Sequence, residues 1–284
     1  MKKNIKNPDI VWGQLKSLNS NAKSLTNELR PLLINNMEAS SLSVIYKVVS
    51  KLTKGNKDIR ILDFGCGGGA MVTYLRLLGY NNVIGVDVES QTHTHNLNSI
   101  HRRMGFSKII FFSYDGVTLP FDNLSFDIII SQQVLEHVHN VEQYFSECYR
   151  VLDYKGEMLL DFPHRLMPFD THTRMWFVHY FSKPVRGFFY NRYRKGSADY
   201  YNNLLNLKVL WFYTNLLKKL NFTFVNITSD RVSSFSYRDN YEGNIVLRSA
   251  INNLFKIPLI GKYIKYFLSK FFSATLIVKK TNET

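Results

Sequence analysis

The stretch that decides the fold is Ile61-Leu62-Asp63-Phe64-Gly65-Cys66-Gly67-Gly68-Gly69-Ala70. Its first four residues are mostly apolar and predict a buried strand, and the apolar pattern that begins at Ala70 predicts a helix. The turn between them is rich in glycine, which lets backbone amides come close to a ligand at the N-terminus of the helix. The stretch therefore predicts a strand, a turn and a helix, with a ligand site at the turn.

From Asp58 onwards, short apolar runs alternate with helical patterns. Strands are expected at residues 59–64, 82–86, 108–113, 126–131, 157–162, 223–229 and 274–279. Helices are expected at residues 70–78, 92–104, 141–152 and 203–220. Strands that alternate with helices favour right-handed crossovers and a parallel sheet.

A second carboxylate, Asp87, follows the next expected strand. At that position it can accept hydrogen bonds from the hydroxyls of a ribose. Gly65, Gly67 and Ala70 also satisfy the pattern of a dinucleotide-binding turn, so this alternative stays open on the turn alone. Asp63 argues against it, because an acid two positions before the first glycine would repel a pyrophosphate. An acid there suits a ligand with a positively charged amino group.

Four later segments, in consistent order, resemble the class I methyltransferases that use S-adenosylmethionine (SAM). They are Tyr114-Asp115-Gly116, the run Leu119-Pro120-Phe121 to Ser125-Phe126-Asp127, Gln133-Val134-Leu135-Glu136-His137-Val138, and residues 149–157. With the glycine turn, the resemblance covers residues 58–163. It implies an α/β, Rossmann-like fold: a doubly wound, seven-stranded, mostly parallel sheet with an antiparallel strand near the C-terminus, plus a helical cap. It also implies SAM as the cofactor and methyl transfer as the activity.

The same resemblance implies which residues bind the cofactor. The expected set is Asp63, Gly65, Cys66, Gly67, Gly69, Asp87, Val88, Asp115, Gly116 and Gln132. Asp63 would hold the amino group of the methionine part, Asp87 the ribose and Asp115 the adenine. Each has a structural alternative: Asp63 beside a helix dipole, Asp87 as a helix cap and Asp115 as part of an Asp-Gly turn. Cys66 fits a small packing residue better than a reactive thiol.

Candidates for a general base lie in the loops that follow the fourth and fifth strands of the resembled fold. A base is required only where the acceptor must lose a proton of high pKa, as a sugar hydroxyl must. The candidates are His137, His164, Asp170, His172 and His179, each with the alternative of a hydrogen-bonded structural residue. No spacing of potential ligands suggests a metal site.

Residues 162–179 combine histidine, arginine and aromatic side chains at unusual density. This segment more loosely resembles an insertion of methyltransferases from bacterial polysaccharide gene clusters. Arg165, Arg174 and Trp176 are the candidate substrate-binding residues, and the two arginines suit a phosphate. An aromatic cap with polar groups is what a sugar site needs.

The net charge of +14 over 284 residues is concentrated in the second half. Residues 1–150 contain 16 Lys and Arg against 13 Asp and Glu, whereas residues 151–284 contain 20 against 9. This excess indicates an anionic partner, with solubility alone as the alternative. Apolar residues at helical spacing over 259–272, with lysines between them, suit either an anionic membrane surface or the edge of the sheet. A basic and aromatic cluster at 183–195 makes nucleic acid a weaker alternative.

The sequence thus predicts four parts: a helical segment at 1–57, the cofactor-binding core at 58–163, a cap at 164–220 and the last strands at 221–284. Two cysteines and the lack of a signal-like or membrane-spanning run favour the cytoplasm, with peripheral contact at the inner membrane face as an option. The expected reaction methylates a hydroxyl of a sugar, or of a nucleotide-linked or lipid-linked glycan precursor, in polysaccharide biosynthesis. The alternatives are a quinone-like lipid or RNA acceptor, a non-catalytic SAM-binding protein, and an NAD-dependent oxidoreductase.

Overall fold

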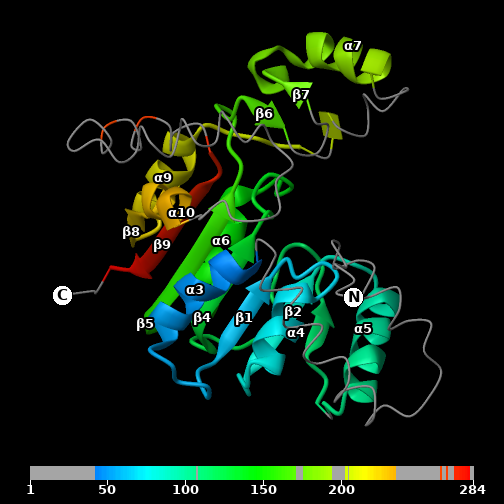
Figure 1. Ribbon diagram of the computed structural model, residues 1–284, viewed down its shortest axis with the longest axis vertical. Helices are drawn as coiled ribbons and strands as arrows, with labels where there is room; N and C mark the ends of the chain where they lie inside the picture. Colours follow the sequence, from blue (N-terminus) through cyan, green and yellow to red (C-terminus); the bar gives the residue numbers. More distant parts are fainter. Residues whose placement is uncertain are drawn as a thin grey trace, which may run out of the picture. The chain divides into compact units, whose positions relative to one another are not determined.

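The computed structural model describes residues 42–106, 108–170, 175–193, 202–203, 205–234, 263, 267 and 272–281. Its main element is a seven-stranded sheet in the order β3-β2-β1-β4-β5-β9-β8 (Figure 1). The strands are β1 (Ile61–Phe64), β2 (Val83–Asp87), β3 (Phe111–Ser113), β4 (Phe126–Gln132), β5 (Leu152–Phe162), β8 (Phe222–Asn226) and β9 (Ala274–Lys280). A separate two-stranded hairpin consists of β6 (Phe169–Asp170) and β7 (Met175–Trp176).

The pairing of the strands confirms the predicted fold class. β1 runs parallel to β2 on one side and to β4 on the other, and β2 runs parallel to β3. Near the end of the chain, β9 is antiparallel to both β5 and β8. The strand order reverses between β1 and β4, and open α/β sheets bind ligands beyond the carboxyl ends of the strands at such a reversal.

The helices that follow the first strands lie where the sequence predicts them. They are α4 (Ala70–Leu77), α5 (Gln91–Arg103) and α6 (Val141–Val151). The helix α3 (Leu42–Thr53) precedes β1, and the part of the predicted N-terminal segment before it lies outside the described residues. In the predicted helix at 259–272, only Tyr263 and Phe267 are described as helical, and both are exposed.

Three expected boundaries in the second half are wrong. The strand expected over 157–162 begins at Leu152, as β5. The strand expected over 223–229 ends at Asn226, because the Asn226 side chain accepts a hydrogen bond from the Thr228 amide and α10 (Thr228–Ser234) begins there. The helix expected over 203–220 is interrupted: Asn203 is helical, residues 205–209 are not, and α9 spans Leu210–Lys219. Just before α9, Lys208 is bonded elsewhere: its amide donates to the Tyr213 hydroxyl and its carbonyl accepts from the Arg165 amide.

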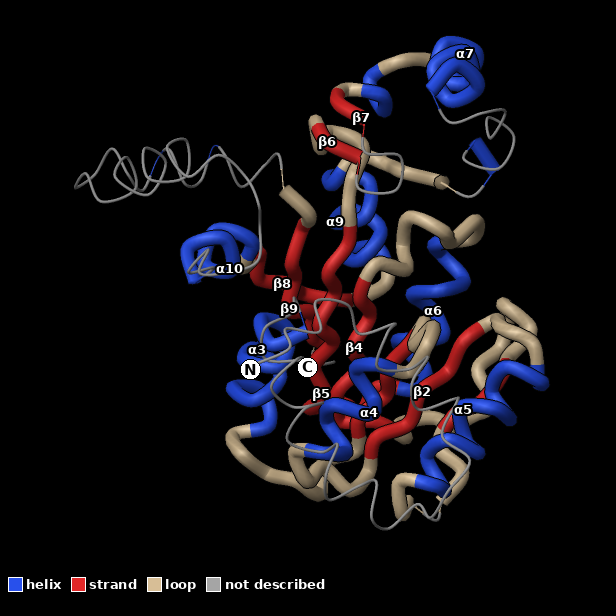
Figure 2. The backbone as a smooth tube through the Cα atoms, turned by 45° about the vertical axis from the view of Figure 1, so that its right-hand side comes forward, coloured by secondary structure: helices blue, strands red, loops and turns tan. Residues whose placement is uncertain are grey.

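The described residues form two compact units. One comprises the residues up to 130 together with 151–153, and the other comprises 131–150 and the residues from 154 onwards. In the first unit, every residue of β1 is buried, and α4 turns six of its eight side chains inward. Figure 2 shows α4 and α5 alongside the strands of this unit. The α3 helix is held to α4 by edge-on packing of Tyr46 on Tyr74, with ring centroids 5.3 Å apart.

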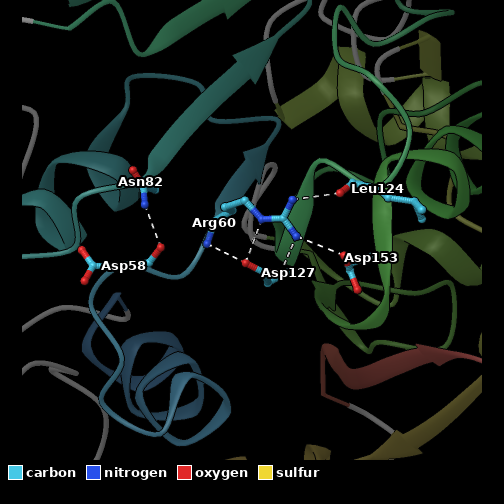
Figure 3. A network of polar contacts seen from close by, with 6 residues as sticks. All are labelled: Asp58, Arg60, Asn82, Leu124, Asp127 and Asp153. Carbon is cyan, nitrogen blue, oxygen red and sulfur yellow. Dashed lines mark hydrogen bonds and ion pairs between the residues drawn. The ribbon is translucent and has the colours of Figure 1, made fainter.

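Arg60 ties together the starts of the strands in this first unit (Figure 3). Its guanidinium donates to the Asp127 carboxylate at 2.6 and 3.0 Å, to the Leu124 carbonyl at 3.0 Å and to Asp153 at 3.1 Å. These bonds hold the pKa of the Asp127 carboxyl below its usual range. Asp127 belongs to one of the segments that resemble the methyltransferases, and here it stabilises the edge of the sheet opposite the ligand end.

In the second unit, the segment after β5 contains the β6–β7 hairpin, a short 3-10 helix η1 (Val178–Tyr180) and the helix α7 (Lys183–Tyr193). Tyr190 of α7 and Val178 of η1 are buried against each other, with Met175 packed beside them. This small cluster fixes α7 to the hairpin. The predicted division of the chain into four parts stays a prediction.

Candidate functional site

The glycine turn leaves β1 at Gly65 and enters α4 after Gly69. Both Gly65 and Cys66 donate their amides to the carbonyl of Val86 on β2, at 2.8 and 3.1 Å. At Gly69, φ is +73° and a Cβ atom would come within 2.6 Å of the Phe111 ring. Gly69 is therefore required for the close packing of the turn on β3, whereas its expected contact with the cofactor stays a prediction.

Gly67 is held on both sides of its peptide backbone. Its amide donates to the Asp87 carboxylate at 2.7 Å, and its carbonyl lies 3.2 Å from the Nε2 atom of His93 on α5. Its φ is +47°, and a Cβ atom there would meet nothing within 4 Å. The turn is thus fixed at Gly67 while the space beside this residue stays open, which is the arrangement that a backbone-binding ligand requires.

Asp63 is the buried carboxylate of this turn. It lies on the central strand β1, between Gly85 of β2 and Ile130 of β4, and is 4% exposed. Loss of hydration, and secondly the nearby charge of Asp87, raise the pKa of Asp63 to about 7. An uncompensated carboxylate of this kind gains from a neighbouring cation, because the cation stabilises its ionised form.

Cys66 contributes packing to the turn. Its sulfur lies beneath Gly85, where a Cβ atom would come within 2.9 Å of it. Burial raises the pKa of the Cys66 thiol, with the charge of Asp63 adding to the effect. A buried thiol kept protonated in this way is a poor nucleophile, which agrees with the packing role expected from the sequence.

Val88, Asp115 and Gly116 follow the ends of β2 and β3. Val88 is 62% exposed, and a Cβ atom on Gly116 would lie 3.6 Å from it, so the two residues are neighbours. The Asp115 side chain accepts hydrogen bonds at 2.8 Å from the amides of Val117 and Thr118, which lower the pKa of its carboxyl. Asp115 thus makes the turn that the Asp-Gly pair predicts, beside an exposed apolar surface that suits an adenine ring.

The structure also decides the alternative for Asp87. The side chain that caps α5 is Ser90, which accepts from the amide of His93 at 3.2 Å. Asp87 is therefore not the helix cap, and its carboxylate bonds to the glycine turn instead. The ring of His93, a residue that the sequence analysis did not single out, reaches the Gly67 carbonyl from α5.

Two of the expected residues lie in the loop after β4, in the second unit. Gln132 is the half-buried last residue of β4. His137 is half-buried in the loop, with its Nε2 atom 3.9 Å from the carboxylate of Glu136. The loop is held by Asn206, whose side-chain amide donates to the carbonyl of Val138 at 2.9 Å.

Asp170 and His179 are brought together by the hairpin. The His179 Nε2 atom lies 3.4 Å from the Asp170 carboxylate, and both side chains are 3% exposed. The other ring nitrogen of His179 is buried without a hydrogen-bond partner among the described residues. A carboxylate beside an imidazole orients the ring, which is the arrangement of a positioned base.

The remaining candidates of this segment are separate from that pair. His164 is buried, and loss of hydration lowers its pKa to about 4, so its ring is neutral at physiological pH. Arg165 is exposed and donates to the carbonyl of His179 at 3.3 Å, and Trp176 is 65% exposed. His172 and Arg174 lie outside the described residues.

Within the described part of the chain, no three His, Cys, Asp or Glu side chains lie close enough to hold a metal ion. A search of the same residues finds no helix with the length and apolar character needed to cross a membrane.

The residues at the turn fit SAM better than a dinucleotide. Two carboxylates, Asp63 and Asp87, lie close enough for one to raise the pKa of the other. That negative charge disfavours a pyrophosphate and favours an ammonium group. Asp87, the open side of Gly67 and the exposed Val88 provide acceptor, backbone and apolar surfaces for the rest of such a ligand.

Comparisons with known proteins agree with this site. Residues 62–160 match the family model described as a methyltransferase domain. The ubiquinone biosynthesis O-methyltransferase of Bartonella tribocorum is 31% identical over 103 residues, which is 36% of this chain and 40% of that protein. The phosphoethanolamine N-methyltransferase of Plasmodium falciparum is 28% identical over 129 residues, which is 44% of this chain and 47% of that protein.

A solved structure extends the likeness in fold. The geranyl diphosphate C-methyltransferase of Streptomyces coelicolor, in complex with Mg²⁺, geranyl diphosphate and S-adenosyl-L-homocysteine, superposes with a TM-score of 0.51 at 17% identity. The match covers 89% of this chain and 84% of that one. The curated relatives match over much less of their own length, 30% to 42% for the first four. Residues 62–160 are therefore a methyltransferase domain of the class I family, and SAM is its cofactor.

Proposed function

We propose that this protein transfers a methyl group from SAM to a hydroxyl of a sugar, carried by a nucleotide-linked or lipid-linked glycan precursor. The main support for methyl transfer from SAM is the buried Asp63 beside Asp87 at the glycine turn, because this pair of carboxylates suits a cationic ligand. The proposal for the acceptor rests on the segment 164–181, which combines aromatic rings, an exposed arginine and a buried Asp–His pair.

Residues beside the glycine turn have specific roles in this proposal. Asp63, when ionised, holds the ammonium group of the methionine part. Asp87 accepts hydrogen bonds from the ribose with the carboxylate that also fixes Gly67. Val88 and Gly116 offer an apolar surface to the adenine, and Asp115 reaches its amino group from the turn that it stabilises.

Bound SAM supplies a methyl group on a sulfonium, which is a good leaving group. The protein must therefore align the acceptor, exclude water and remove a proton where the acceptor has one of high pKa. His179 is the best base among the described candidates, because Asp170 orients its ring and its second nitrogen is unpartnered. His164, with a pKa of about 4, is too weak a base for this step.

A phenolic, quinone-like lipid is the second candidate for the acceptor. It is favoured by the relatives, among which ubiquinone biosynthesis O-methyltransferases from several organisms recur. The acceptors named for the relatives differ, however, and the similarity covers little more than the cofactor domain. The relatives therefore support the cofactor more strongly than the acceptor.

Two experiments test the proposal. Isothermal calorimetry with SAM and NADH on the same protein should give binding of SAM alone, and binding of NADH alone would overturn the assignment. Incubation of the protein with a cell extract and methyl-labelled SAM, followed by separation of glycan, lipid and RNA fractions, should place the label in the glycan. Label confined to the quinone fraction would select the second candidate, and label in RNA would exclude both.

A further inference from the structure

The segment 175–193 exposes an unusual number of large apolar side chains for its length. Those most exposed are Trp176, Phe177, Tyr180, Phe181, Val185, Phe188 and Tyr193. They lie on β7, on α7, and at or beside η1, whose caps are Phe177 and Phe181. η1 contacts α7, and β7 and α7 lie close together in Figure 1. We call these side chains, with the cations among them, the aromatic–cationic surface. Soluble monomers seldom expose contiguous apolar surface of this kind unless it binds something.

The rings pack in two groups rather than at scattered positions. Trp176 lies 5.9 Å from Phe177, which lies 5.8 Å from Tyr180. Further along, Phe181 lies 5.4 Å from Phe189, measured between ring centroids. The helix α7 buries Gly187 and Tyr190 on its inner side, whereas Val185 and Phe188 lie exposed on another. The surface thus has an apolar helix face with no protein packed over it among the described residues.

The charged side chains of this segment are all positive. Residues 175–193 contain Lys183, Arg186 and Arg192 and no Asp or Glu. Lys183 and Arg192 are exposed, and the Arg192 guanidinium lies 5.6 Å from the centre of the Tyr193 ring. An occupant of this surface must therefore be apolar where the rings meet it and anionic around them.

We propose that the aromatic–cationic surface docks the protein on an anionic lipid bilayer. Amphipathic segments with aromatic and aliphatic side chains beside lysine and arginine bind the interface between headgroups and acyl chains. Anionic headgroups attract the cations, and the rings enter the apolar region. The exposed Phe and Val side chains favour a bilayer over single-stranded nucleic acid. In the acyl-chain region they gain free energy simply by leaving water, and no nucleic-acid base is needed to cover them. The proposal goes beyond methyl transfer and does not require turnover.

Co-sedimentation of the full chain with vesicles tests the proposal. The protein should bind vesicles of phosphatidylcholine mixed with phosphatidylglycerol, and bind vesicles of phosphatidylcholine alone much less. The variant Phe181→Ser/Phe188→Ser should lower the partition coefficient by about tenfold for each ring that inserts. Lys183→Glu/Arg192→Glu should lower it by about fivefold for each cation lost.

Matched controls lie elsewhere on the surface. Trp211 of α9 is 66% exposed, like Phe188, so Trp211→Ser should bind vesicles as the unmodified protein does. Lys47→Glu/Lys51→Glu reverses two exposed charges on α3 and should also have little effect. Thermal unfolding of each variant would show that the fold is retained.

Fluorescence locates the contact on the molecule. The chain has three tryptophans, so Trp12→Phe/Trp211→Phe leaves Trp176 as the reporter, and Trp12→Phe/Trp176→Phe leaves Trp211. Brominated lipids in anionic vesicles should quench Trp176 and leave Trp211 unchanged. Three results would overturn the proposal. They are equal quenching of both tryptophans, absence of vesicle binding, and binding to poly-uridine that is abolished only in the Phe181→Ser/Phe188→Ser variant.

Discussion

The glycine turn and the segment at 175–193 differ in burial and in how their polar groups are satisfied. The turn lies between buried parallel strands, and its polar groups bond within it: Asp87 and His93 both hold Gly67. The segment at 175–193 has a small buried cluster and leaves its rings exposed. A site for a small charged cofactor requires rigid, buried polar groups, whereas a surface for a large partner requires accessible area. The two regions therefore suit two different ligands, and separate variants should affect them independently.

The largest expected effect is at Asp63. The interval between the ordinary pKa of 3.8 and about 7 corresponds to roughly 4 kcal/mol of destabilisation in the unliganded protein. This destabilisation is complete above pH 7, decreases as the pH falls towards 3.8, and is absent below it, because the folded state then binds the proton more tightly than the unfolded state. Asp63→Asn should raise the free energy of unfolding at pH 8 by up to that amount, measured by denaturant titration, with no gain at pH 4.

The same variant should lose affinity for SAM, measured by calorimetry at pH 8, because the ammonium group loses its counter-charge. Affinity of the unmodified protein should fall as the pH drops below about 7, where Asp63 becomes protonated. Asp127→Asn is the control: it breaks bonds to Arg60 at the opposite edge of the sheet and should lower stability without changing SAM affinity. Weakened stability and unchanged SAM affinity in Asp63→Asn would remove Asp63 from the cofactor site.

The next largest effect is expected from a change in the second unit that leaves the cofactor turn of the first unit intact. Asp170→Asn leaves the glycine turn untouched and removes the charge that orients His179. Methyl transfer to a hydroxyl should then slow by about a hundredfold in kcat, while SAM affinity is unchanged. The rate against pH should also change shape, because the base has lost its partner. A proportional fall in SAM affinity, or a normal kcat, would show that the pair is only structural.

Asp87→Ala tests the role of the glycine turn in binding the cofactor. The variant loses the acceptor for the ribose and leaves the Gly67 amide without its carboxylate. SAM affinity should fall at least about tenfold, or roughly 1.4 kcal/mol, by calorimetry. Vesicle binding through the aromatic–cationic surface should not change. An unaltered affinity would exclude Asp87 from the site.

The smallest effect is expected at His93. His93→Ala removes one weak bond to the Gly67 carbonyl, so SAM affinity should fall about threefold. His93→Gln keeps a donor that can reach the turn and should recover most of the loss. The neighbouring change His95→Ala, on the exposed side of α5, is the control and should have no effect. Failure of glutamine to rescue would leave His93 as a packing residue only.

The first half of the fold follows from local patterns in the sequence. β1, the glycine turn and α4 lie where the apolar runs and glycines predict them, within one or two residues. The second half was less predictable. The helix expected at 203–220 is broken over residues 205–209, because tertiary hydrogen bonds to Arg165 and Tyr213 engage Lys208 just before α9. Short-range periodicity carries no information about such partners.

The sequence by itself determined the class of fold and the position of the cofactor turn, because strand and helix periods and glycine chemistry are local properties of the chain. Only the tertiary structure decided what individual side chains do. It placed Asp127 on Arg60, Ser90 rather than Asp87 at the helix cap, and His93 against Gly67. It also buried Asp170 with His179 and left the rings at 175–193 exposed. Burial and pairing between distant residues set these roles, and both depend on how the whole chain packs.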